Sequence, residues 1–198
     1  MGLIRVTVFL SMSPMRICYA LWIGFYILWL LWAARIKQAE RRERGFTYFL
    51  HRLLVAAGFV LIFLDLPVSW FYRPLLPGTP WLPVLGVAIA VGGFAGAIWA
   101  RSHIGRNWSS AVTAKVQHEL IRSGPYRWVR HPIYSGLLLA ILGTVLVQNQ
   151  MRGLVALVLV YAGWKIKSRL EEQMMVSTFG DQYMAYAKST GALFPRLH

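Results

Sequence analysis

Long apolar runs alternate with short basic segments along the chain, and this pattern predicts a helical membrane protein. A helix needs about 20 mostly apolar residues to cross a bilayer, and three runs approach this length, at 18–34, 49–68 and 81–100. Two shorter runs, at 133–147 and 154–164, flank the polar residues 148–153, a turn of the length found between antiparallel helices. We therefore expect an all-α polytopic protein with about five transmembrane helices, the last two of which form a helical hairpin.

Glycines predict where helices end and where they pack. No helix breaker precedes Gly180, so the second hairpin helix should continue past the membrane to Phe179, and Asp181 can cap a short helix after it. The third run contains Gly92, Gly93 and Gly96, which sit in the middle of a span. Small residues at such positions favour close packing of helices, whereas a nucleotide-binding glycine loop would follow a strand.

Composition and charge support the membrane class and set an orientation. The 198 residues are 57% hydrophobic and only 14% charged, far from the balance of a soluble domain. The net charge is +14, but the basic residues interrupt apolar runs, which argues against nucleic acid as the main partner. Of the 21 lysines and arginines, 17 fall in three segments, at 35–52, 101–130 and 165–198. Positive charge marks cytoplasmic loops, so we expect the N-terminus outside and the C-terminus in the cytoplasm.

The lone cysteine limits the chemistry. Cys18 lies in an apolar run, and a single cysteine excludes both an intramolecular disulfide and a multi-cysteine metal site. We expect no metal.

The segment at 117–136, QHELIRSGPYRWVRHPIYSG, carries the first candidate chemistry. A residue before proline favours extended backbone, so His131 should lie outside the helix that Pro132 begins. The free N–H groups of Ile133 and Tyr134 would then offer a site for an anion, such as the carboxylate of an amino acid, and the neighbouring Arg130 would strengthen it. The alternative is a basic, aromatic belt at the membrane interface.

Glu171 and Glu172 are adjacent acids in a chain with only seven. They follow the fifth apolar run, and the hairpin should bring them to the same face as His131. The alternative is that they form ordinary helix-surface pairs, Lys167 with Glu171 and Arg169 with Glu172, which are worth a few tenths of a kcal/mol.

Together these residues resemble a known family. His118 with Leu120, then GPYRWVRHPIYSG, then the paired glutamates, then FGDQYMAYAK and a closing LFPRL are similar to the isoprenylcysteine carboxyl methyltransferases and their phospholipid methyltransferase relatives. The likeness covers residues 105–195. It implies an N-terminal transmembrane region at 1–104 and a cofactor-binding region at 105–198, which contains the last two spans.

The resemblance also implies roles for individual residues. The residues with an expected role in the reaction or the acceptor contact are Glu171, His131 and Lys167. Lys167 occupies a position where the prenylcysteine enzymes have an arginine, and Arg169 is close by; a lysine cannot provide the planar fork of an arginine. The expected cofactor contacts are His118, Glu119, Leu120, Ile121, Tyr126, Arg130, His131, Pro132, Ile133, Tyr134, Glu171 and Glu172.

The implied activity is methyl transfer from S-adenosylmethionine to a lipophilic acceptor, most simply the carboxylate of a prenylcysteine. The expected setting is a bacterial or archaeal cytoplasmic membrane, with membrane lipids and a lipid or prenylated substrate as partners and the site facing the cytoplasm. Three alternatives stay open: N-methylation of a phospholipid amine, a non-enzymatic scaffold, and a membrane reductase that uses NADPH. Ile133 and Leu137 depart from the residues expected of the reductases.

Overall fold

The computed structural model describes residues 13–33, 45–105 and 120–196. Their secondary structure is helical, without a β-strand in these ranges, which confirms the all-α prediction. The elements are α1 (Pro14–Ala33), α2 (Phe46–Phe63), the 3-10 helix η2 (Ser69–Tyr72), α3 (Leu82–Ile104), the 3-10 helix η4 (Gly124–Arg127), α4 (Pro132–Gln148), α5 (Met151–Phe179) and α6 (Asp181–Ser189).

The helices have the length and surface of membrane spans. α1, α2 and α3 are each long and apolar enough to cross a bilayer, and α4 is a shorter apolar helix. Large apolar side chains face outward, among them Ile23, which is 61% exposed, and Val84, which is 67% exposed. Outward-facing apolar surface on helices of this length is typical of contact with lipid, and the chain is an integral membrane protein. The count of about five spans and the orientation stay predictions.

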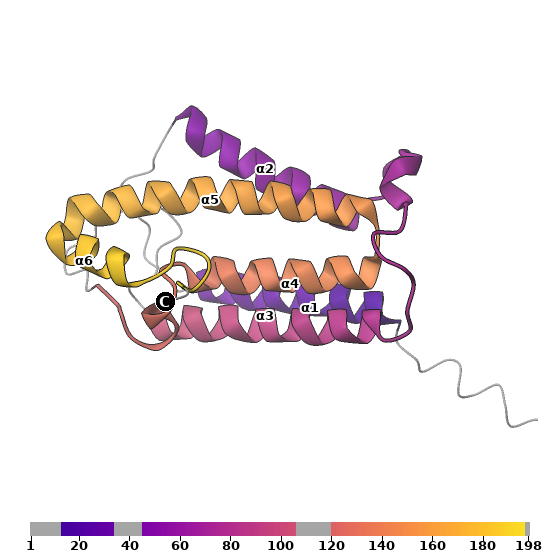
Figure 1. Ribbon diagram of the computed structural model, residues 1–198, viewed down its shortest axis with the longest axis horizontal. Coiled ribbons are helices and arrows are strands. Elements are labelled where there is room, and N and C mark those ends of the chain that lie inside the picture. The colour runs from indigo at the N-terminus through magenta and orange to yellow at the C-terminus, as the bar shows by residue number, and fades with distance from the viewer. Residues whose placement is uncertain (1–12, 34–44, 106–119, 197–198) are drawn as a thin grey trace, which may run out of the picture.

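The described helices form two groups (Figure 1). α1, α3 and α4 lie side by side, while α2 packs along α5. α3 and α4 approach so closely that a side chain on Gly93 would collide with the backbone of Ala140, and a Cβ on Gly136 would lie 2.7 Å from the Ala97 nitrogen. The prediction of small-residue packing is confirmed for Gly93 but wrong for Gly92 and Gly96, which have nothing within 4 Å of a Cβ position.

α2 and α5 run antiparallel with equally close contact. A Cβ on Gly58 would lie 2.9 Å from the Ala156 carbonyl oxygen, and one on Gly163 would lie 2.9 Å from the His51 carbonyl oxygen. Residues with lower numbers on α2 therefore lie opposite residues with higher numbers on α5. This pairing places the beginning of α2 beside the part of α5 that carries Lys167.

The hairpin between α4 and α5 is tighter than predicted. Only Asn149 and Gln150 separate the two helices, because Asn149 adopts the left-handed conformation at φ 47° and ends α4. Of the other residues in the predicted turn, Gln148 ends α4 and 151–153 begin α5. There the buried Arg152 donates hydrogen bonds to the Leu64 carbonyl (2.8 Å) and to Asp65 (2.9 Å). α2 correspondingly ends at Phe63 and not at 68.

The far end of α5 follows the prediction in part. The helix continues to Phe179 and ends at Gly180, whose φ of 52° suits glycine. Asp181 is not a cap: Gly180 occupies the N-cap position of α6, and no side chain caps it. Asp181 is instead the first residue of α6, where its negative charge interacts favourably with the positive end of the helix dipole.

Candidate functional site

The start of α4 has the predicted geometry. His131 lies outside the helix with φ −123° and ψ 59°, and Pro132 is the first helical residue. Within the described residues, the N–H groups of Ile133 and Tyr134 donate to no acceptor. The first turn of α4 therefore keeps two backbone donors for an anion.

The C-terminal segment 190–196, which we call the tail, packs against the approach to α4. The backbone N–H of Arg130 donates to the Gly191 carbonyl at 2.9 Å, and that of His131 to the Ala192 carbonyl at 3.1 Å. The Ser135 hydroxyl donates to the Leu193 carbonyl at 2.6 Å. The closing LFPRL was expected only as part of the family resemblance, and its docking was not predicted, because strand-like pairing of so short a segment leaves no periodic signal.

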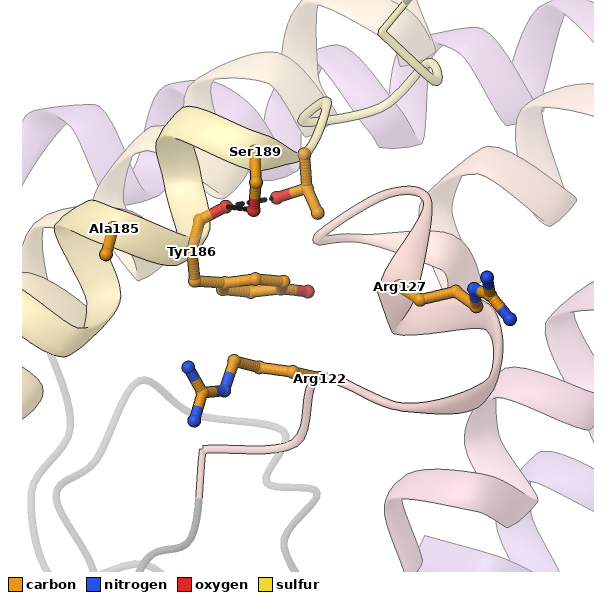
Figure 2. A pocket seen from close by; sticks show the side chains of 6 residues that line it. Arg122, Arg127, Ala185, Tyr186 and Ser189 are labelled. Carbon is orange, nitrogen blue, oxygen red and sulfur yellow. Dashed lines mark hydrogen bonds between the residues drawn. The ribbon is translucent and has the colours of Figure 1, made fainter.

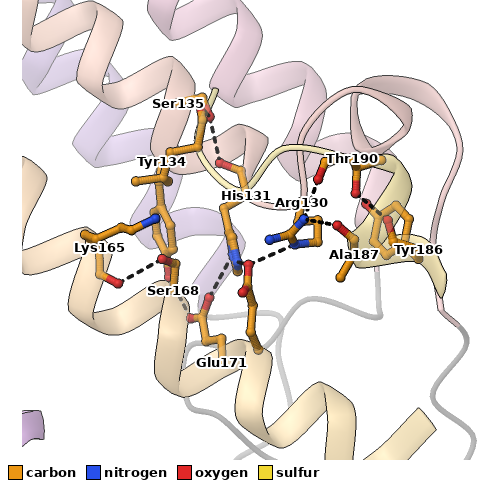
Figure 3. A network of polar contacts seen from close by, with 12 residues as sticks. Arg130, His131, Tyr134, Ser135, Lys165, Ser168, Glu171, Tyr186, Ala187 and Thr190 are labelled. Atoms are coloured by element: carbon orange, nitrogen blue, oxygen red, sulfur yellow. Dashed lines mark hydrogen bonds and ion pairs between the residues drawn. The ribbon is translucent and has the colours of Figure 1, made fainter. Parts of the chain in front are cut away.

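His131 lies between the two glutamates of α5 (Figure 3). Its Nδ1 is 3.3 Å from Glu171 Oε2, and its Nε2 is 3.1 Å from Glu172 Oε1. The imidazole is 10% exposed and each carboxylate side chain 24%. The predicted meeting of His131 with the glutamate pair is confirmed. Both ring nitrogens face carboxylate oxygens, which can only accept, so the arrangement favours the doubly protonated imidazolium.

The pKa shifts agree with this charge state. Burial works to lower the pKa of His131, but hydrogen bonds and charges from Glu171 and Glu172 outweigh it, and the pKa is raised. Burial works to raise the pKa of Glu172, but hydrogen bonds from His131 and Arg130 lower it to about 2. The pKa of Glu171 is also lowered, because His131 and Lys167 oppose the effect of burial. These groups therefore form a charged network at neutral pH.

Arg130 joins this network to the tail. Its Nε donates to Glu172 Oε1 at 2.8 Å, and its Nη1 donates to the carbonyls of Ala187 (3.0 Å) and Thr190 (2.5 Å). One guanidinium thus fixes the carboxylate on α5 and the end of α6 together, a task suited to its rigid fork of donors. The alternative pairing of Arg169 with Glu172 is wrong: the ion pair of Glu172 is with Arg130, and Arg169 is exposed.

A second row of side chains continues the site along α5. The Tyr134 hydroxyl donates to Glu171 Oε1 at 2.6 Å. The Tyr134 ring stacks between His131 and Trp164, with ring centroids 5.7 and 5.6 Å away. The Lys167 ammonium lies 5.4 Å from the Tyr134 ring centroid and 3.8 Å from Glu171 Oε1. Of the two basic residues proposed for the acceptor, the structure places Lys167 in this cluster.

Three further predicted residues, Tyr126, Leu120 and Ile121, do not contact the His131 cluster through any hydrogen bond or ion pair found among the described residues. Tyr126 is buried in the core, where its hydroxyl donates to the Ala100 carbonyl at 3.4 Å, and burial raises its pKa. Leu120 and Ile121 are half-buried at the start of the described segment. His118 and Glu119 lie outside the described residues. The cofactor contacts proposed for these five residues stay predictions.

A small hollow of about 250 Å³ lies between the end of α6 and the segment around η4 (Figure 2). Its lining residues are Arg122, Arg127, Ala185, Tyr186, Ser189 and Thr190. The Arg122 side chain extends below the Tyr186 ring, whereas the head of Arg127 points away from it. The hydroxyls of Ser189 and Thr190 donate to the Tyr186 carbonyl, so they are already engaged. None of the residues predicted for the site lines this hollow.

Comparison with known proteins identifies the family. A sequence model of the family described as phospholipid methyltransferase matches residues 81–182. The protein-S-isoprenylcysteine O-methyltransferase of Mus musculus is 27% identical over 70% of this chain and 50% of its own length. The cobalt-zinc-cadmium resistance protein CzcN of Cupriavidus metallidurans is 31% identical over 59% of this chain and 49% of its own. The chain thus spans about half the length of the curated relatives it matches.

A solved structure has a similar fold. The eukaryotic intramembrane Ras methyltransferase ICMT (isoprenylcysteine carboxyl methyltransferase) matches 94% of this chain and 68% of its own, with a TM-score of 0.64 and 21% sequence identity. The family match covers α3, α4 and α5, and with them the whole cluster around His131. This chain therefore belongs to the phospholipid methyltransferase family.

Proposed function

We propose that this protein is an S-adenosylmethionine-dependent methyltransferase that methylates the carboxylate of a prenylcysteine-type acceptor. Relatives named protein-S-isoprenylcysteine O-methyltransferase support the reaction class. The observation that carries the choice of acceptor is the position of His131 between Glu171 and Glu172.

The cluster has groups that fit the charged end of the methyl donor. The free N–H groups of Ile133 and Tyr134 would bind its carboxylate at the positive end of α4. Glu171, whose side chain is partly exposed, would bind its ammonium. Arg130 and Glu172 would hold the tail and His131 in place around these contacts. When bound, the donor would supply a methyl group on a positively charged sulfur.

The protonation of the cluster favours a carboxylate over an amine as the acceptor. A protonated amine must lose a proton before it can be methylated, so it needs a general base. His131 has no free lone pair when both nitrogens donate to carboxylates, and the lowered pKa values of Glu171 and Glu172 make them weak bases. A carboxylate needs no base: its oxygen forms the bond to the methyl carbon as the bond from sulfur breaks.

The residues of this chain would assist that displacement by alignment and by excluding water. Opposite charges combine as the carboxylate meets the sulfonium, so a site with little water favours the reaction. Lys167 lies beside Tyr134 and Glu171 and would orient the acceptor carboxylate as a single point charge. The apolar helices at 1–104 would guide the lipid part of the acceptor to the region at 105–198, at the cytoplasmic face of a bacterial or archaeal membrane.

Labelled methyl transfer in nanodiscs tests the proposal. Purified protein is incubated with methyl-labelled S-adenosylmethionine and either N-acetyl-S-farnesylcysteine or phosphatidylethanolamine. We expect label in the farnesylcysteine product that alkali releases as methanol, since an ester is hydrolysed and an N-methyl group is not. Glu171→Gln should abolish most of it, and the exposed Arg169→Gln provides the matched control.

Two results would overturn the proposal. Alkali-stable label in phosphatidylethanolamine would show the N-methylation that the family description also allows. The absence of both cofactor binding and labelled product, with NADPH bound instead, would favour the reductase.

A further inference from the structure

α2 presents one buried polar side chain to α5. The buried face of α2 consists of His51, Gly58, Leu61 and Ile62, and His51 is only 4% exposed. An imidazole in such a face costs free energy unless its nitrogens are used. The sequence predicts no chemistry before residue 105, and the cluster around His131 does not use His51.

The hydrogen bond of His51 indicates which nitrogen is free. Nδ1 lies 3.4 Å from the Thr47 carbonyl oxygen. A carbonyl can only accept, so Nδ1 carries the proton and Nε2 of the neutral ring keeps its lone pair. In the described part of the chain no hydrogen bond of Nε2 is found, and Nε2 is not among the fully buried atoms that lack a partner, so it keeps some accessible surface. The side chain therefore offers one acceptor atom.

Helix packing places His51 near Lys167, the residue proposed to bind the methyl acceptor. Gly163 allows the His51 backbone to approach α5, and Lys167 follows Gly163 by one helical turn on the same face. The Lys167 ammonium lies 3.8 Å from Glu171 Oε1. The start of α2, which carries His51, therefore packs beside the stretch of α5 that carries Lys167.

We propose that His51 is a specificity-determining residue that recognises the amide N–H of a peptide-like acceptor. The inference rests on the proposed function. In a C-terminal prenylcysteine the carboxylate and the amide N–H are attached to the same Cα, so Lys167 can bind the first while His51 Nε2 accepts a hydrogen bond from the second. A simple lipid acid has the carboxylate but no N–H, and it would leave Nε2 unpaired.

The test compares two acids that differ in this group: N-acetyl-S-farnesylcysteine and the S-farnesyl thioether of propionic acid. We expect wild type to prefer the amide-containing acid by about fivefold in kcat/KM. His51→Phe should bring the ratio close to one without changing the affinity for S-adenosylmethionine. His51→Gln, which keeps an acceptor oxygen, should retain part of the preference. Phe49→Leu, on the exposed face of the same helix, is the matched control.

The outcomes separate this inference from the proposed function. Methylation of both acids with an unchanged preference in His51→Phe, or with no preference in wild type, would overturn the role of His51 alone. Loss of cofactor affinity in His51→Phe would also overturn it, because the residue would then support the cofactor side. Absence of cofactor binding and of methylation of either acid by wild type would overturn the proposed function.

Discussion

His131 Nδ1 lies 3.3 Å from Glu171 Oε2. The two residues are 40 positions apart in the sequence: His131 directly precedes α4, and Glu171 lies in the last part of α5. The contact is possible because Pro132 places His131 just before α4, while α5 is long enough, from Met151 to Phe179, to present Glu171 beside it. Tyr134 and Lys167 contact the other oxygen of the same carboxylate. Glu171 is therefore the group on which the two halves of the cluster meet.

Replacement of Glu171 by Gln should weaken cofactor binding. The change removes the charge that faces His131 and Lys167 but keeps the size of the side chain. Hydrogen bonds to charged groups are worth about 1.5–3 kcal/mol, so we expect a loss of roughly 10- to 100-fold in affinity. Titration calorimetry with S-adenosylmethionine measures it. Asp181 is an exposed acid at the start of α6, and the control variant Asp181→Asn should bind the cofactor with wild-type affinity. If Glu171→Gln also bound it with wild-type affinity, Glu171 would not be part of the binding site.

Lys167 and Arg169, two basic residues of α5, should differ in their effect on the acceptor. Lys167→Gln should raise the KM for N-acetyl-S-farnesylcysteine by about tenfold, because a charged contact is lost. Arg169→Gln should change it by less than about twofold, as expected of an exposed surface charge. Steady-state kinetics at saturating cofactor distinguish the two. The reverse order would show that the acceptor approaches the other face of α5.

The charged network should make stability depend on pH. The pKa of His131 is raised in the folded protein, so its stabilising contribution is complete below its ordinary value of 6.5 and is lost as the pH rises through the raised value. The pKa of Glu172 is lowered, so its contribution is complete above 4.5 and is lost only as the pH falls toward about 2.

Thermal unfolding in detergent from about pH 6 to about pH 9 measures the first effect. The wild-type unfolding temperature should fall across this range as His131 loses its proton. His131→Asn should be less stable at the acid end and show a smaller fall. Equal slopes in the two proteins would mean that another group titrates.

The contact between α3 and α4 should not tolerate a side chain. Gly136→Ala places a Cβ 2.7 Å from the Ala97 nitrogen, and the backbones must separate. Overpacking of this kind costs about 1–3 kcal/mol, so we expect a clearly lower unfolding temperature in detergent. Gly92→Ala adds the same methyl group in open space and should be neutral or slightly stabilising. Similar stability of both variants would contradict the packing.

The sequence by itself determined the features that are local. The lengths of the apolar runs predicted the helices, Pro132 fixed the start of α4, and Gly180 fixed the end of α5, because each depends on the conformational limits of one residue and its neighbours. The hairpin then brought His131 and the glutamate pair to one face, which chain connectivity alone requires. These elements carry most of the candidate site.

Only the tertiary structure decided which face of each helix meets which neighbour. Gly93 packs and Gly92 does not, and Glu172 pairs with Arg130 and not with Arg169. Successive helical residues point about 100° apart, but a helix that is apolar all round gives no sign of its inward face. His51 was missed for the same reason: only the approach of α2 to Gly163 brings the backbone of an isolated histidine next to the stretch of α5 that carries Lys167.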